Sequence, residues 1–137
     1  MTKNYSNLYV CVLATLFPIF AACNHTTIED RAENEAKDFT ERYCPTPVRD
    51  MQRTDSVTFD RTTHTFKYYY SLVGAADNPE AIDKVKSQLK PALIKDLIAN
   101  TQNKLYKEEG YNFHYIYRSE SKKNTLYELV LTAKDYK

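Results

Sequence analysis

The chain has 137 residues, with 19 basic and 18 acidic side chains and a formal net charge of +1. This length suffices for one compact domain and not for two. The near-neutral charge argues against a nucleic-acid partner, which normally requires a strongly basic domain, and it offers no polybasic attraction to acidic lipid head groups.

An apolar run from Leu8 to Ala22 begins the chain. It is interrupted by Pro18 and is shorter than the roughly 20 apolar residues that a membrane-spanning helix needs. A secretory signal has an apolar region of ~7–15 residues, preceded by positive charge and followed by small residues. Lys3 and Ala21-Ala22 meet both requirements. We therefore predict a cleaved signal peptide over residues 1–22.

The residues Phe20-Ala21-Ala22-Cys23 resemble the lipobox of bacterial lipoproteins, with Phe20 where Leu is commoner. The resemblance implies that Cys23 is acylated, with palmitate as a typical chain, and becomes the new N-terminus. Residues 23–26 would then be a lipidated end and short tether, and residues 27–137 a single domain. This places the protein in the cell envelope, anchored to a membrane, with the outer membrane favoured.

Two other readings of the same segment remain open. An ordinary signal peptide cut near Ala22 would leave a soluble secreted protein with a free Cys23. An uncleaved anchor is less well supported because the apolar run is short. If Cys23 is acylated, Cys44 is the only thiol left in the exported chain. We interpret Cys44 as a buried, inert thiol, with a reactive or intermolecular thiol as the alternative.

The first predicted helix covers residues 27–43. Thr26 or Thr27 can cap it, with the acids Glu29 and Asp30 following as in a capping box. One helical face carries an apolar stripe formed by Ile28, Ala32, Ala36, Phe39 and Tyr43. Pro45 ends the helix.

A predicted hairpin follows an extended connection over residues 45–53. Residues 55–59 form a short strand, residues 60–63 a turn, and residues 64–73 a second, clearer strand. In the second strand, apolar and polar side chains alternate with the period of two that marks one buried face.

Asn78-Pro79 is typical of an N-cap followed by a first-turn proline. It predicts a long helix running toward Gly110, with Pro91 expected to kink or divide it near Lys90. The inward stripe of this helix is formed by Ile82, Val85, Leu89, Leu93, Leu97 and Ile98, with Leu105 extending it.

A second predicted hairpin ends the chain, with strands over 111–118 and 125–133 and a polar turn over 119–124. The element order is therefore α-β-β-α-β-β. It predicts an α+β fold: a two-layer domain with an antiparallel four-stranded sheet and helices mainly on one face, preceded by a cleaved signal peptide.

The layout resembles a group of small exported bacterial domains without an assigned activity. The likeness rests on the Cys44-Pro45 pair after the first helix, on the tyrosine-rich strand over residues 66–70, and on a long helix before the last hairpin. It implies the fold and carries no catalytic residue across.

The sequence carries no motif of a catalytic centre, so we predict no catalytic residue, no metal site and no cofactor. The three histidines, His25, His64 and His114, include no pair at the spacing that places two metal ligands on one helical face. The two glycines, Gly74 and Gly110, cannot form a phosphate-binding loop. We predict that the protein is not an enzyme; a hydrolase that uses scattered carboxylates is the least favoured alternative.

Successive side chains of a strand point to opposite sides of the sheet, which assigns each strand residue to one side. Five tyrosines are predicted to face the helices, namely Tyr68, Tyr70, Tyr111, Tyr115 and Tyr117. The opposite side, called the open face below, carries Lys67, Tyr69, His114, Ile116, Arg118 and Glu128. Mixed aromatic, aliphatic and charged groups suit protein binding, although a merely solvated sheet face has the same composition.

These observations predict a membrane-anchored envelope lipoprotein that acts as a non-catalytic binding module, with a protein as its partner. Two alternatives from other classes remain. One is an inhibitor or immunity-type protein that blocks a lytic enzyme. The other is an accessory subunit of a surface transport or adhesion complex.

Overall fold

The computed structural model describes residues 25–137, so the predicted signal peptide and Cys23 lie outside the described residues. Helix α1 (Ile28–Tyr43) precedes the strands β1 (Gln52–Asp60) and β2 (Thr65–Leu72). The short 3-10 helix η1 (Gly74–Ala76), the long helix α2 (Pro79–Ala99) and the short helix α3 (Lys104–Glu108) follow. Strands β3 (Asn112–Ser119) and β4 (Thr125–Leu131) and the helix α4 (Ala133–Tyr136) complete the domain.

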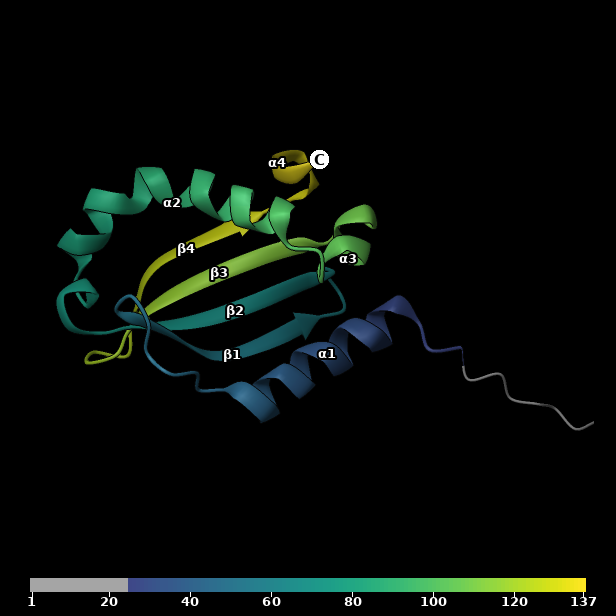
Figure 1. Cartoon of the computed structure of the whole chain (residues 1–137), viewed down its shortest axis with the longest axis horizontal. Helices are drawn as coiled ribbons and strands as arrows, with labels where there is room; N and C mark the ends of the chain where they lie inside the picture. The colour runs from purple at the N-terminus through teal and green to yellow at the C-terminus, as the bar shows by residue number, and fades with distance from the viewer. Residues whose placement is uncertain (1–24) are drawn as a thin grey trace, which may run out of the picture.

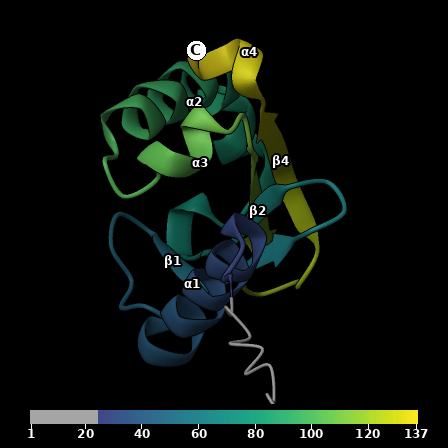
Figure 2. The same ribbon diagram turned by 90° about the vertical axis from the view of Figure 1, so that its right-hand side faces the viewer.

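The α+β class, the element order and the two hairpins agree with the prediction. The sheet has the order β1-β2-β3-β4, and the helices α1 and α2 lie on the same side of it (Figures 1 and 2). Ala32 and Ala36 of α1 join Ile82 and Leu97 of α2 in one core cluster. Within residues 25–137, no helix combines the length and apolar character needed to cross a bilayer.

The prediction of a wholly antiparallel sheet is wrong at its centre. Strands β2 and β3 are parallel, whereas both outer pairs are antiparallel. The reason is the length of α2, which at ~1.5 Å per residue spans roughly 30 Å, about as far as an eight-residue strand. The helix therefore returns the chain to the end of the sheet where β2 began (Figure 1), and β3 must start in the same direction as β2.

The parallel register produces an aromatic ladder on the helix side. Tyr68 pairs with Tyr115 and Tyr70 with Tyr117, and their ring centres lie 5.3 and 5.1 Å apart in nearly parallel planes. The predicted inward tyrosines are thus confirmed: Tyr111, Tyr115 and Tyr117 are buried, and Tyr68 and Tyr70 pack against the core.

Helix α1 begins with the predicted capping box, formed by Thr27 and Asp30. Its side chains also protect the outer edge of β1. The Thr40 hydroxyl donates to the carbonyl oxygen of Val57 at 2.7 Å and accepts from the Val57 N–H at 2.8 Å. This contact fixes α1 beside β1, because it satisfies backbone groups that an edge strand otherwise leaves unpaired.

The predicted stripes are only partly buried. In α1, Ala32 and Ala36 are buried, whereas Phe39 and Tyr43 are 39% and 61% exposed. In α2, Val85 and Ile98 are likewise exposed. Amphipathic spacing identified the side of each helix correctly, but the helix layer does not cover all of these side chains.

Two boundaries differ from the prediction. Pro91 does not divide α2, which continues to Ala99 and has Asn100 as its C-cap. The Lys107 ammonium donates to the carbonyls of Leu97, Ile98 and Asn100 at 2.7–2.9 Å, which satisfies the acceptors that a helix end leaves free. Strand β1 begins at Gln52 instead of residue 55, because residues 52–54 pair with residues 70–72 of β2.

Candidate functional site

The open face has the arrangement that the sequence predicts. Lys67 lies beside His114, Tyr69 beside Ile116, and Ile116 beside Glu128 in the sheet register. All six predicted residues therefore share one side of the sheet, and the structure brings them together.

Most polar groups of the open face already have partners. His114 Nε2 lies 3.1 Å from a carboxylate oxygen of Glu128, and Lys67 Nζ donates to Asp60 at 3.1 Å. The Arg118 guanidinium lies 5.9 Å from the centre of the Tyr69 ring, within cation–π range. These polar groups therefore pair with one another and need no ligand, as is usual on a solvated sheet face.

The helix side offers a different surface, a row of three neighbouring hollows that we call the interhelical groove. One hollow of about 290 Å³ is bounded by Phe39 on α1 and by Asn103 beyond α2, with Tyr68 and Tyr70 on its floor. A second, of about 370 Å³, shares Tyr70 and Thr54 with the first. A third, of about 260 Å³, shares Gln52 with the second.

The third hollow is almost wholly apolar. Met51, Leu72, Ile82, Val85 and Leu89 line it together with Tyr117. Neighbouring hollows share lining residues of β1 and β2, and α1 borders the first hollow while α2 borders the third.

The groove includes three of the seven large apolar side chains that are exposed within residues 25–137. Phe39, Met51 and Val85 line it and are 39%, 49% and 41% exposed. Tyr43 continues this surface over α1, beside Phe39, with the two ring centres 5.5 Å apart. Clustered exposed apolar side chains mark interaction sites more often than single ones do.

The tyrosines on the floor are held neutral. Burial raises the pKa of Tyr68 and of Tyr117 to about 12, and it raises the pKa of Tyr70 and Tyr115 further. These phenols therefore present uncharged hydroxyls and do not act as anions at neutral pH.

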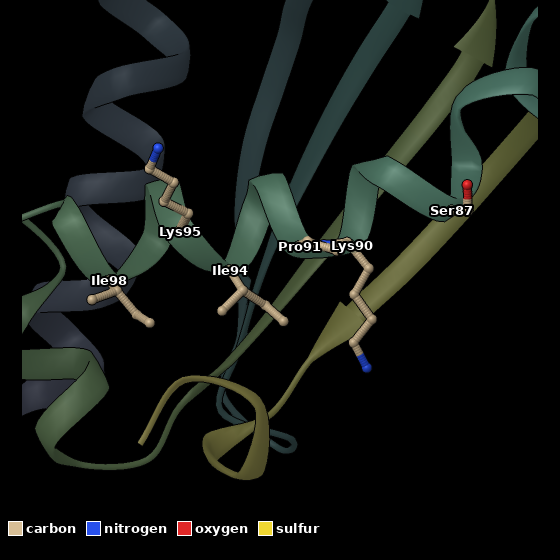
Figure 3. Close-up of a pocket in the computed structure, with 6 residues that line it drawn as sticks. All are labelled: Ser87, Lys90, Pro91, Ile94, Lys95 and Ile98. Carbon is tan, nitrogen blue, oxygen red and sulfur yellow. The ribbon is translucent and has the colours of Figure 1, made fainter.

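Another hollow, of about 650 Å³, lies along the outer flank of α2 (Figure 3). Lys90, Pro91, Ile94 and Ile98 line it, all from the one helix. In Figure 3 these side chains point toward α4, away from α1. A surface supplied by a single helix encloses a ligand on few sides, so the interhelical groove is the better candidate.

No catalytic centre emerges from the described residues. Within residues 25–137, no group of three His, Cys, Asp or Glu side chains could hold a metal ion. Cys44 is a free, half-buried thiol at the C-cap of α1. Burial and, to a smaller extent, the charge of Asp55 raise the pKa of this thiol, which keeps it protonated and weakly nucleophilic.

The groove was not predicted from the sequence. The alternation of side chains along a strand and the spacing of apolar residues along a helix indicate only the side to which each residue points. Tyr68, Tyr70, Phe39 and Val85 do point toward the other layer, as predicted. The available signal was the excess of inward aromatic and aliphatic side chains over what two helices can cover, with the small Ala32 and Ala36 at the centre of α1.

Comparisons with known proteins give a family and a shared fold. Residues 27–127 match a protein family described as a domain of unknown function, DUF8479. Comparison with curated protein sequences finds no match.

Three solved structures share the fold. A protein from Pseudomonas aeruginosa described as secreted superposes with a TM-score of 0.68 at 12% identity, covering 80% of this chain and 92% of its own. The type 2 secretion pilotin EpsS from Vibrio vulnificus gives a TM-score of 0.60 at 12% identity and the same 80% coverage, with 91% of its own chain. The type II secretion pilotin AspS from Vibrio cholerae gives 0.56 at 16% identity, covering 78% and 90% of the two chains.

Proposed function

The chain belongs to the DUF8479 family, and from its fold and groove we propose that it is a non-catalytic binding module for a protein of an envelope secretion assembly. The observation that carries the proposal is the interhelical groove, where Phe39 in one hollow and Met51 and Val85 in another expose apolar surface. The pilotin fold of two neighbours supports the class of partner. The same likeness favours an accessory subunit over an inhibitor or immunity-type protein.

The shape of the groove indicates the kind of segment that it accepts. Helix α1 packs on β1 and α2 packs on β4, and Tyr68 and Tyr70 of β2 line a hollow on the same side of the sheet. Helices pack beside one another at 8–10 Å, and an amphipathic helix with its apolar face toward the groove is a common mode of recognition. We therefore propose an amphipathic helix of the partner as the occupant.

Photo-crosslinking in intact cells tests the location, because Tyr69 and Tyr70 are adjacent in β2 and face opposite sides of the sheet. A photoreactive phenylalanine analogue at position 70 should crosslink a component of a secretion assembly, while the analogue at position 69 should not. Introducing Phe39→Asp should abolish the product, because it places a charge on the apolar wall.

The opposite pattern would assign binding to the open face. In that case position 69 crosslinks, and Arg118→Ala weakens the product while Phe39→Asp does not. A crosslinked partner unrelated to secretion would contradict the proposed class of partner.

We further propose that Cys23 is acylated and anchors the domain to an envelope membrane, with the outer membrane favoured. The lipobox-like residues 20–23 support this, and α1 begins at Ile28, which would keep the domain close to the bilayer. The neighbours include a secreted protein and two secretion pilotins, which is compatible with an envelope location.

Metabolic labelling with palmitate tests the anchor. The wild-type chain and a Cys44→Ala control should incorporate label, and Cys23→Ala should incorporate none and leave the membrane fraction, since multiple acyl chains provide firm attachment. Label retained by Cys23→Ala would contradict the assignment.

A further inference from the structure

Asp96 is an acidic side chain on the groove side of α2. It lies seven residues after Leu89 and eleven after Val85, a spacing that keeps all three on one helical face, and both of those residues line the groove. The Asp96 side chain is exposed. Its carboxylate makes no ion pair or side-chain hydrogen bond to any residue in the described range 25–137.

The sequence of α2 explains why Asp96 has no ion-pair partner on its own helix. The positions three and four residues from Asp96 are Ala92, Leu93, Ala99 and Asn100, so α2 offers no basic neighbour at the spacing that forms helical ion pairs. Asp83 of the same helix has one in Lys86, at 2.8 Å. Across the groove, Glu35 of α1 is paired with Arg31 at 2.6 Å.

Three tyrosine hydroxyls on the same side of the sheet also lack partners. Tyr115 and Tyr117 are only 7% and 5% exposed, and their hydroxyls, like that of Tyr70, make no hydrogen bond within residues 25–137. None of the three oxygens is sealed from solvent, because Asp77 Oδ1 is the sole buried and unpartnered side-chain oxygen or nitrogen in that range. By contrast, the hydroxyl of Tyr106 donates to Glu35 at 2.7 Å.

The carboxylate acts electrostatically on two of these phenols. The charge of Asp96 contributes, after burial and neighbouring tyrosines, to raising the pKa of Tyr115 and Tyr117. The groove wall therefore combines apolar side chains with a local set of hydrogen-bond acceptors and one uncompensated negative charge.

We propose that the interhelical groove selects a helix that carries a lysine or arginine within its apolar face, positioned to meet Asp96 and the hydroxyl of Tyr117. This inference rests on the proposed docking of a helix in the groove and adds the chemistry of its contact residue. Lysine and arginine supply three and five N–H donors, which match a carboxylate and phenol oxygens.

The same arrangement disfavours other helices. A helix that is wholly apolar on its buried face would remove Asp96 from water without a counter-charge, which is unfavourable. An acidic residue would add repulsion. Asp96 therefore acts as a specificity determinant through rejection as well as attraction.

The test uses three fluorescent amphipathic helical peptides of one sequence, with leucines on one face and lysine, glutamine or glutamate at its centre. They are titrated into the full-length chain in detergent and followed by anisotropy. The lysine peptide should bind wild type roughly 10-fold more tightly than the glutamine peptide, a ratio that corresponds to about 1.4 kcal/mol, and the glutamate peptide should bind most weakly.

Matched variants make the result specific. Asp96→Asn should bring the lysine-to-glutamine ratio close to one, and Glu80→Gln, which removes a charge from the same helix away from the groove, should leave it unchanged. High salt should reduce the ratio in wild type and have little effect on it in Asp96→Asn.

The outcomes separate the two proposals. If all three peptides bind wild type equally and Phe39→Asp weakens all of them, groove binding stands and the role of Asp96 is overturned. If no peptide binds, or if Phe39→Asp leaves every affinity unchanged, helix docking in the groove fails and the inference fails with it.

Discussion

Replacing Tyr115 by alanine should lower the free energy of unfolding by roughly 3–5 kcal/mol, the cost of removing a buried aromatic ring. Tyr115 is 7% exposed, and its ring stacks on that of Tyr68 with centres 5.3 Å apart. Both strands of the parallel pair lose contact area when this ring is removed. Urea denaturation followed by circular dichroism measures the loss.

Two control variants test this prediction. One separates the contribution of the Tyr115 ring from that of its hydroxyl, and the other compares the two faces of the sheet. Tyr115→Phe should change stability by well under about 1 kcal/mol, because the hydroxyl makes no hydrogen bond within residues 25–137. Tyr69→Ala, on the open face, should cost no more than about 1 kcal/mol, since a surface substitution loses little. Equal losses for Tyr69→Ala and Tyr115→Ala would contradict the assignment of the two faces.

Alkaline pH should unfold the domain through its tyrosines. Burial raises the pKa of Tyr68, Tyr111 and Tyr117 from the ordinary 10.0 to about 12, and it raises the pKa of Tyr70 and Tyr115 further. The folded state therefore keeps these phenols neutral at pH values where the unfolded chain ionises them.

The direction of the effect follows from proton linkage. The contribution of each phenol is fully present below pH 10 and declines as the pH rises toward the folded pKa. For Tyr117 alone, a pKa of about 12 against 10.0 corresponds to a loss of about 2–3 kcal/mol at ~1.4 kcal/mol per pH unit. Several such residues together exceed the stability that a small domain normally has.

Urea denaturation at a series of pH values from 8 upward, with tyrosinate absorbance read in parallel, measures this loss. We expect unfolding and ionisation to coincide above pH 10. Tyr117→Phe should reduce the pH dependence because it removes one of the linked groups. A free energy of unfolding that stays constant through pH 12 would contradict the raised pKa of these phenols.

The groove and the stability of the domain depend on the same aromatic ladder. Tyr68 and Tyr70 stack on Tyr115 and Tyr117, so the floor of the groove is anchored in the core and is not a loose surface patch. A floor held in this way favours binding because little side-chain entropy is lost when a partner docks.

How much of the site was predictable varies from one surface to the other. The six residues of the open face were predicted from alternation alone, since a strand places every second side chain on the same side, and the register confirms that they are neighbours. Their role in binding stays a prediction. The groove was not predicted, because no local pattern reports how far apart two helices settle on a sheet.

The sequence by itself determined the α+β class, the order of helices and strands, the capping box at Thr27 and the face to which each strand residue points. These are local properties, set by periodicity and by the backbone preferences of a few residues. The signal-like apolar run and Cys23 also belong to the sequence, and they define where we propose that the protein works.

Only the tertiary structure decided the parallel pairing of β2 with β3, the hollows on the helix side of the sheet, and the lack of an ion pair for Asp96 within residues 25–137. Each depends on the placement of α2 relative to elements far away in the chain. Packing of a whole layer sets that placement, because the helix must cover β3 and β4 while its length returns the chain to the start of the sheet.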